Sequence, residues 1–140
     1  MYSNTASFVG RLLIGLPFAM GGLVKLASYG HTTALIAGVG LPFPTLAFAV
    51  AVALELGGGL LLIVGYRVRL AAAALAIFCL VTAFYFHTNF ADQLQMANFI
   101  KNVMLTGGLL QIVAFGAGAI SIEQWRQANV TRAASESSAG

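Results

Sequence analysis

The sequence predicts an all-α protein, a bundle of four transmembrane helices, and two observations support this fold class. The first is composition: of 140 residues, 59% are hydrophobic and only 8% are charged, whereas soluble domains carry about 25% charged residues. Because so few charged side chains cannot cover a surface in water, lipid is the expected solvent. The second is length: four apolar segments approach the roughly 20 residues that cross a bilayer as a helix.

The predicted membrane domain covers residues 1–122 and contains four spans. They are expected at residues 8–26, 43–65, 70–86 and 98–120. Arg11 and Lys25 shorten the uncharged part of the first span, but both lie near its ends, where long basic side chains reach the head groups. Residues 123–140 form a polar tail, which we expect to be partly disordered from Ala133 because Ser, Ala and Gly dominate there.

The connections between spans are polar. Ser28–Leu41 is too polar and too rich in glycine to cross a bilayer, and it has room for a short interfacial helix. His87–Ala97, between the third and fourth spans, includes Asp92 and is expected to be a loop outside the membrane core.

The distribution of Lys and Arg predicts that both termini are cytoplasmic. In a four-span protein the termini and the loop between the second and third spans share one side of the membrane. That side carries Arg11, Arg67, Arg69, Arg126 and Arg132, whereas the other carries only Lys25 and Lys101. Cytoplasmic segments carry the excess of Lys and Arg, so the tail is expected inside and Asp92 outside.

Glu55 is the only ionisable residue in the apolar run Phe43–Val64. A charge at the centre of a membrane helix costs about 2.5–3.5 kcal/mol, so a partner or a functional role is expected. The second and fourth spans share a local pattern around Gly58-Gly59 and Gly107-Gly108. If these spans lie side by side with the glycine pairs level, Glu55 and Lys101 differ in height by about 4.5 Å. A lysine side chain covers that distance, which predicts a Glu55–Lys101 ion pair.

This polar group has two interpretations that the sequence leaves open. It can be a structural pair that neutralises two buried charges and fixes helix register, or a site for a ligand, a proton or a redox head group. Asn102 can add hydrogen bonds in either case. Lys25 can be a head-group anchor or a second positive partner of Glu55. Arg11 can be an anchor on the cytoplasmic side or can point inward.

Several function classes are excluded or disfavoured. Nucleic-acid binding is excluded because the net charge of +3 comes from scattered residues and not from a basic patch. Cys79 is the single cysteine, which excludes an internal disulfide and a C-x-x-C motif. Gly57-Gly58-Gly59 lies inside a span and follows no strand, so it is no phosphate loop. The sequence shows no metal-site spacing and no cofactor motif.

The chain resembles the DoxX family over roughly Ser7–Ile122. These segments carry the resemblance: Arg11-Leu12-Leu13-Ile14-Gly15, Gly21-Gly22-Leu23-Val24-Lys25-Leu26, Leu41-Pro42-Phe43-Pro44, Glu55-Leu56-Gly57-Gly58-Gly59, Gly65-Tyr66-Arg67-Val68-Arg69, Phe99-Ile100-Lys101-Asn102 and Gly107-Gly108. The resemblance implies a small bacterial or archaeal membrane protein with four helices. The family name comes from subunits linked to an archaeal quinol oxidase and to thiosulfate:quinone oxidoreductase, and most members have no assigned activity. The residues themselves indicate no cofactor, and quinone is the ligand that the family name suggests.

The sequence therefore predicts an integral protein of the bacterial inner membrane that acts as an accessory membrane subunit of a redox or quinone-linked system. The alternative is a quinone-interacting oxidoreductase subunit with a head-group site at Glu55 and Lys101. The expected partners are the lipid bilayer and either another protein or a second copy of this chain.

The predicted topology can be tested with reporter fusions. A reporter that is active only outside the cytoplasm should be silent when fused after Gly140 and active when inserted at Asp92, because the arginine-rich ends stay inside. Enzymatic activity of the fusions in whole cells is the measurement. Activity at Gly140 together with silence at Asp92 would contradict the orientation.

Overall fold

The structure is a computed structural model that describes residues 2–138, and side chains are described for residues 4–136. Every regular element in this part of the chain is a helix, which confirms the all-α prediction. In chain order the elements are α1 (Tyr2–Ala27), α2 (Tyr29–Gly38), α3 (Pro44–Val52), the π-helix η1 (Ala53–Gly57), α4 (Gly58–Val64), α5 (Val68–Phe86), α6 (Gln93–Phe115) and α7 (Ile122–Ser138).

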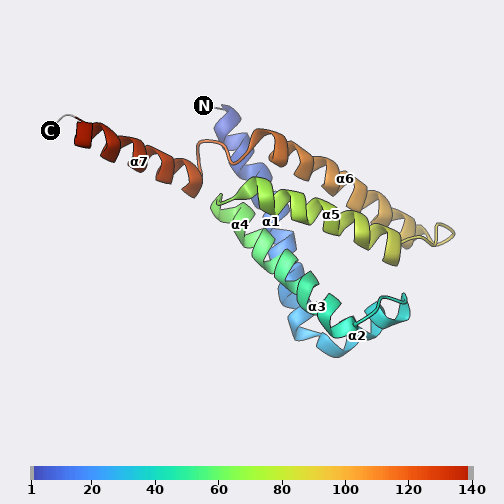
Figure 1. Ribbon diagram of the computed structural model, residues 1–140. Helices are drawn as coiled ribbons and strands as arrows, with labels where there is room; N and C mark the ends of the chain where they lie inside the picture. Colours follow the sequence, from blue (N-terminus) through green and yellow to red (C-terminus); the bar gives the residue numbers. More distant parts are fainter. Residues whose placement is uncertain (1, 139–140) are drawn as a thin grey trace.

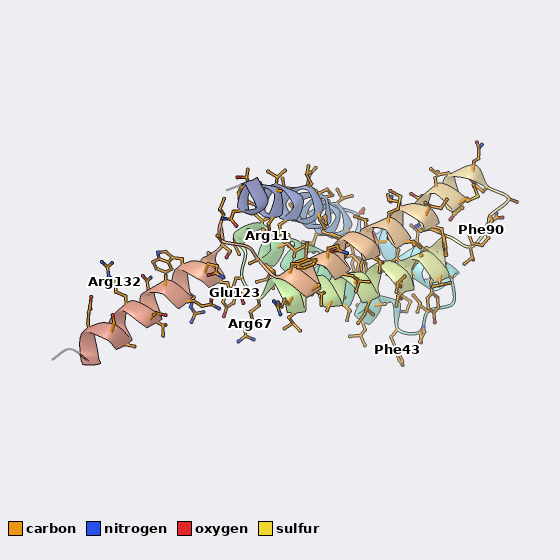
Figure 2. The ribbon with its side chains drawn as sticks, turned by 90° about the horizontal axis from the view of Figure 1, so that it is seen from above. Arg11, Phe43, Arg67, Phe90, Glu123 and Arg132 are labelled. Atoms are coloured by element: carbon orange, nitrogen blue, oxygen red, sulfur yellow. The ribbon has the colours of Figure 1, made fainter. Side chains whose placement is uncertain are left out.

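Four helices are long and apolar enough to cross a membrane, as the sequence predicts: Asn4–Ala27, Pro44–Val64, Val68–Phe86 and Gln93–Phe115. The second span consists of α3, η1 and α4, which follow one another without a break. Large apolar side chains project from the spans, including Leu13 and Met104, which are 70% and 71% exposed. Phe43 and Phe90, which lie in connections between helices, are exposed as well (Figure 2). This apolar exterior is the surface that contacts lipid.

The fourth span is shifted toward the N-terminus relative to the predicted range of 98–120. It begins at Gln93 because Asp92 caps it: Asp92 Oδ1 accepts hydrogen bonds from the main-chain N–H groups of Leu94 at 2.8 Å and Gln95 at 3.4 Å. It ends at Phe115 because Gly116 has a φ of 79°, a left-handed conformation that terminates helices. The loop expected before this span is correspondingly shorter.

The segment between the first two spans and the C-terminal tail both contain helices, α2 and α7. The short helix expected within Ser28–Leu41 is present as α2. The predicted disorder from Ala133 is not observed, because α7 continues to Ser138, and residues 139–140 lie outside the described part. Good helix formers in the sequence of α7 explain this. Main-chain N–H of Glu123 donates to the carbonyl of Gly65 at 3.1 Å, which fixes the start of α7.

The spans pack as two pairs. One consists of α1 with η1 and α4, and the other of α5 with α6. Figure 1 shows the pairs meeting near the turn between α4 and α5 and diverging away from it. Fully buried side chains from both pairs form the core where they meet, namely Leu62, Val68, Leu75, Cys79 and Leu109. The expectation that the second and fourth spans lie face to face is wrong, because α1 takes that place beside the second span.

Glycines explain why α1 packs so closely on the second span. A Cβ atom on Gly59 would lie 2.6 Å from the main-chain N of Ala19 and 2.7 Å from the carbonyl O of Gly15. A Cβ on Gly22 would lie 2.8 Å from the main-chain N of Leu56. By contrast, a Cβ on Gly107 would have nothing within 4 Å. Close backbone approach through small residues is the usual basis of helix packing in lipid, and here Gly59 and the α1 glycines that face the second span serve it, whereas Gly107 does not.

This difference predicts opposite effects for matched alanine substitutions. Gly59→Ala should lower the free energy of unfolding by about 1–3 kcal/mol, because the new methyl group meets main-chain atoms that cannot move independently. Gly107→Ala should leave stability unchanged or raise it by about 0.5–1 kcal/mol, because Ala is favoured over Gly within a helix. Thermal unfolding in detergent measures both. Equal losses would show that α1 does not pack on α4 as described.

Candidate functional site

Glu55 lies on η1, the single π-helical segment within the described spans, and its residue is only 7% exposed. Lys25, in the last turn of α1, is its partner. Lys25 Nζ donates to Glu55 Oε1 at 3.0 Å and lies 2.7 Å from Oε2. A Cβ on Gly21 would sit 3.5 Å from Oε1, so α1 leaves room for the carboxylate. π-Helical turns occur frequently at functional sites, which makes Glu55 the centre of the candidate site.

The predicted ion pair between Glu55 and Lys101 is wrong. Lys101 Nζ instead donates to Asn98 Oδ1 at 2.9 Å, on its own helix. The physical reason is the pairing of the spans: α6 packs along α5, whereas α1 packs along η1 and brings Lys25 to the carboxylate. The role of Lys25 as a positive partner of Glu55 was one of the two interpretations of that residue, and the structure confirms it.

Lys101 nevertheless faces the same cavity as Glu55. This cavity has a volume of about 290 Å³ and lies between α1, η1, α5 and α6. It is lined by Ile14, Pro17, Phe18, Glu55, Phe78, Thr82, His87, Lys101, Asn102 and Leu105. Glu55, Lys101 and Asn102, which the sequence suggested as one polar group, therefore line one cavity, although Glu55 and Lys101 do not contact each other.

A second cavity of about 350 Å³ adjoins the first. It lies between α2, α3, η1 and α5 and is lined by Lys25, Thr32, Leu35, Ile36, Leu41, Ala47, Val50, Ala51, Glu55, Phe78, Val81, Thr82, Phe86 and His87. Because Glu55, Phe78, Thr82 and His87 line both cavities, we treat them as one space, the inter-pair cleft. Its walls are mainly apolar, and its polar groups come from all four spans or their ends.

The polar groups of the inter-pair cleft are mostly hydrogen-bond donors. Asn102 is buried, and its Nδ2 donates to the carbonyl of Asn98 at 3.0 Å. His87 Nδ1 lies 2.8 Å from Gln95 Oε1, which links the end of α5 to the first turns of α6. If Nδ1 carries the proton of a neutral ring, Nε2 is an acceptor. With the ammonium groups of Lys25 and Lys101, the cleft offers a cationic, donor-rich wall beside aromatic side chains.

Arg11 points inward, which was the second of its two interpretations. It is 1% exposed, and its Nη1 donates to the carbonyl of Leu62 at 2.8 Å. Its Nη2 donates to the carbonyl of Ile120, in the segment after α6. Arg11 therefore ties α1 to α4 and to the segment that follows α6, and it lies outside the inter-pair cleft. Figure 2 shows it among the helices, whereas Arg67 and Arg132 project outward.

Sequence reasoning did not place Thr82 or His87 at the site. The available signal was their position: Thr82 is a hydroxyl within the apolar third span, and His87 follows that span directly. Cys79 is fully buried in the core, as its apolar surroundings suggest. Among the described residues, no group of three or more His, Cys, Asp or Glu side chains is arranged to hold a metal ion.

Together these features define an integral membrane protein, a helix bundle with a polar cleft between two helix pairs. The DoxX family model matches residues 6–88, more than half of the chain, and the chain belongs to the DoxX family. Two proteins of Escherichia coli K12 are similar to it. Inner membrane protein YqjF is 36% identical over 116 residues, which cover 83% of this chain and 88% of that protein. Inner membrane protein YphA is 31% identical over 121 residues, covering 83% and 86%. No solved structure matches.

The Lys25–Glu55 pair predicts non-additive stability changes. Removing one partner of a buried pair costs about 3–5 kcal/mol, whereas removing both often costs less. Lys25 has a side chain that is 31% exposed, so the losses in Lys25→Met and Glu55→Gln should fall at or below the lower end of that range. The double variant should recover part of the summed loss. Thermal unfolding of the four proteins in detergent gives the coupling.

Lys101→Met supplies the control for this cycle. Combined with Glu55→Gln, it should give additive losses, because Lys101 does not contact the carboxylate. Coupling between Glu55 and Lys101 without coupling between Glu55 and Lys25 would contradict the observed pairing of the spans.

Proposed function

We propose that this protein is an accessory membrane subunit of a quinone-linked system and that it holds a quinone-type molecule by the head group in the inter-pair cleft. The observation that carries the proposal is the position of Lys25, Lys101 and Asn102, which are hydrogen-bond donors lining an apolar cleft inside a membrane protein. Ligand sites typically combine apolar walls with a few such polar groups.

The chemistry of the cleft matches a quinone head group. Quinone carbonyl oxygens accept hydrogen bonds, and Lys25 and Lys101 are charged donors that line the larger and the smaller cavity, respectively. Hydrogen bonds to charged groups contribute about 1.5–3 kcal/mol. Glu55 balances the charge of Lys25, so a neutral head group can enter without leaving that cation unpaired. The aromatic rings of Phe78 and Phe86 supply apolar wall for a quinone ring.

The size and the location of the cleft also suit a lipophilic molecule. The larger cavity, at about 350 Å³, falls within the range of about 300–1,000 Å³ that small-molecule pockets occupy. Leu35, Val50 and Val81 line it and are themselves about half exposed on the lipid-facing surface. A ligand with an isoprenoid tail can therefore keep the tail among lipids while the head group meets the polar residues.

The accessory role means that this chain contributes binding and orientation. The redox centre that exchanges electrons with the quinone would belong to a protein partner. The resemblance to a family named after subunits of quinone-linked enzymes supports this assignment, and the geometry of the cleft supports the binding step. The proposal assigns no electron transfer to the residues of this chain.

A ligand-stabilisation experiment tests the proposal. A short-tailed ubiquinone analogue should raise the unfolding temperature of the detergent-solubilised protein, and an alkylbenzene with the same tail should not. Lys101→Met should weaken the apparent affinity about tenfold or more, because a charged hydrogen bond is lost. Gln111→Met is the matched control, since it removes an exposed polar group from the same helix outside the cleft.

The result has clear opposing outcomes. Stabilisation by the quinone that Lys101→Met removes and Gln111→Met retains supports the head-group site. Equal stabilisation by the alkylbenzene, or equal quinone affinity in Lys101→Met and the native protein, would overturn it.

A further inference from the structure

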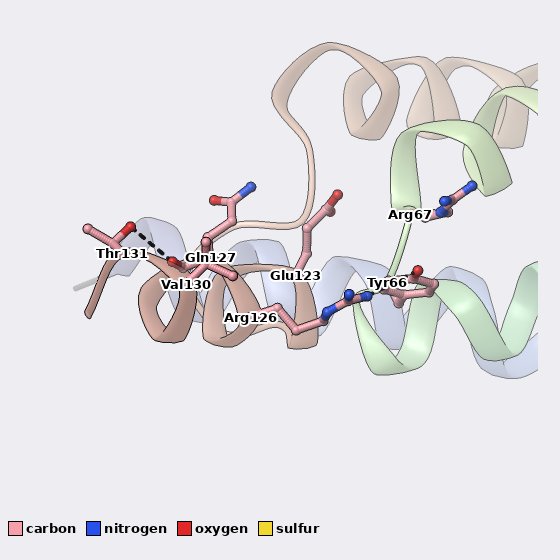
Figure 3. A pocket seen from close by; sticks show the side chains of 7 residues that line it. All are labelled: Tyr66, Arg67, Glu123, Arg126, Gln127, Val130 and Thr131. Atoms are coloured by element: carbon pink, nitrogen blue, oxygen red, sulfur yellow. Dashed lines mark hydrogen bonds between the residues drawn. The ribbon is translucent and has the colours of Figure 1, made fainter. Parts of the chain in front are cut away.

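A separate cavity lies at the turn that joins α4 to α5. Its volume is about 540 Å³, and it is lined by Tyr66, Arg67, Glu123, Arg126, Gln127, Val130 and Thr131. Figure 3 shows it between the turn and the first turns of α7. It shares no lining residue with the inter-pair cleft. Because the spans on either side end at Val64 and begin at Val68, the cavity lies at the boundary between the membrane and water.

Two arginines converge on Tyr66 in this cavity. Arg126 Nη1 donates to the Tyr66 hydroxyl at 3.2 Å, and the Arg126 guanidinium lies 5.5 Å from the ring centroid. The Arg67 guanidinium lies 5.8 Å from the same ring. Hydrogen bonds and charge from Arg67 and then Arg126 lower the pKa of Tyr66. The phenol hydroxyl therefore sits in a positive potential, which favours an anion beside it.

The positive charge of this cavity is not neutralised within the described part of the chain. The ion pairs among the described residues are Lys25–Glu55 and Arg132–Glu136, so neither Arg67 nor Arg126 has a carboxylate partner there. Glu123 lines the cavity and offsets one of the two charges at a distance. One net positive charge and the donors of two guanidinium groups remain available.

The backbone at Arg67 also points to a role for its side chain. Arg67 has φ 46° and ψ 39°, a left-handed conformation that Gly or Asn adopts at lower cost. Strained positions of this kind concentrate at functional sites. The left-handed conformation itself does not require an arginine, and at this position it places the guanidinium beside the Tyr66 ring.

Trp125 indicates where the cavity lies relative to the membrane. It precedes Arg126 and is 68% exposed. Exposed tryptophans of membrane proteins are enriched at the level of the lipid head groups, where phosphate groups are the abundant anions. Arginine binds phosphate through paired N–H groups, and basic residues next to a span attract anionic lipids.

We propose that Tyr66, Arg67 and Arg126 form a binding site for the phosphate group of an anionic membrane lipid. Arg67 and Arg126, whose guanidinium groups lie 5.8 Å and 5.5 Å from the centroid of the Tyr66 ring, donate to phosphate oxygens. The Tyr66 hydroxyl, which accepts from Arg126, donates its own proton to a third oxygen. The site ties the start of α7 to the membrane surface and is independent of quinone binding in the inter-pair cleft.

Native mass spectrometry of the full chain in detergent tests this site. Phosphatidylglycerol should bind about tenfold more tightly than phosphatidylcholine. Arg67→Gln and Arg126→Gln should each remove most of this preference. Arg132→Gln is the matched control, because it makes the same charge change on the same helix outside the cavity and should keep the preference. Glu123→Gln should tighten phosphatidylglycerol binding, because a competing negative charge is removed.

Two further measurements complete the test. One identifies the source of the phosphate, and the other distinguishes a loss of lipid binding from a loss of folding. Inorganic phosphate at the same concentration should not compete with the lipid, and full competition would overturn a lipid site. Arg67→Gly relieves the backbone strain, so it should fold at least as stably as the native protein yet lose the preference. Retention of the preference in Arg67→Gly, or equal loss in Arg132→Gln, would also overturn the proposal. Lys101→Met should leave lipid preference unchanged, which separates this test from that of the quinone site.

Discussion

The guanidinium of Arg11 is the constraint on which the arrangement of the two helix pairs depends. It donates to main-chain carbonyls of Leu62, near the end of α4, and of Ile120, after the end of α6. Leu62 lies in the last turn of α4, where unpaired carbonyls carry partial negative charge, so its carbonyl stabilises the buried guanidinium. Because this bridge holds the pairs together at one end, they can diverge at the other (Figure 1), and the inter-pair cleft lies beyond the shared core.

The two lysines of the cleft have different roles because only one of them is neutralised. Lys25 and Glu55 form a close ion pair that joins α1 to η1. Lys101 contacts an amide oxygen on its own helix and has no carboxylate partner among the described residues. The Lys25–Glu55 pair therefore matches the structural interpretation of the buried carboxylate. Under the proposed function, Lys101 is the donor that a ligand would recruit without breaking an ion pair.

The spans could be predicted from the sequence because the length and apolarity of a membrane helix are local properties. The partner of each span could not, because glycine pairs indicate close packing without saying which helix approaches. Gly58-Gly59 and Gly107-Gly108 look equivalent in the sequence, yet only the first meets a neighbouring backbone. The sequence indicated that Glu55 and Lys101 lie at similar depths in the bundle. It did not indicate that Lys25 is the ion-pair partner of Glu55, because that contact depends on how α1 packs. The boundaries of α6 depended on Asp92 as a cap and on Gly116 in a left-handed conformation.

The turn between α4 and α5 joins the Arg11 bridge to the proposed lipid site, and its packing explains which part of the molecule can adapt. Gly65 has a φ of 73°, and a Cβ there would lie 2.6 Å from both Arg11 Nη1 and Ser121 Cβ. The carbonyl of Gly65 also accepts the hydrogen bond that fixes the start of α7. A turn packed this closely cannot shift without disturbing Arg11, so an anionic lipid at Tyr66 would reinforce an end that is already closed. Adjustment to a ligand must then occur at the opposite end, where α2, α3 and the end of α5 line the larger cavity.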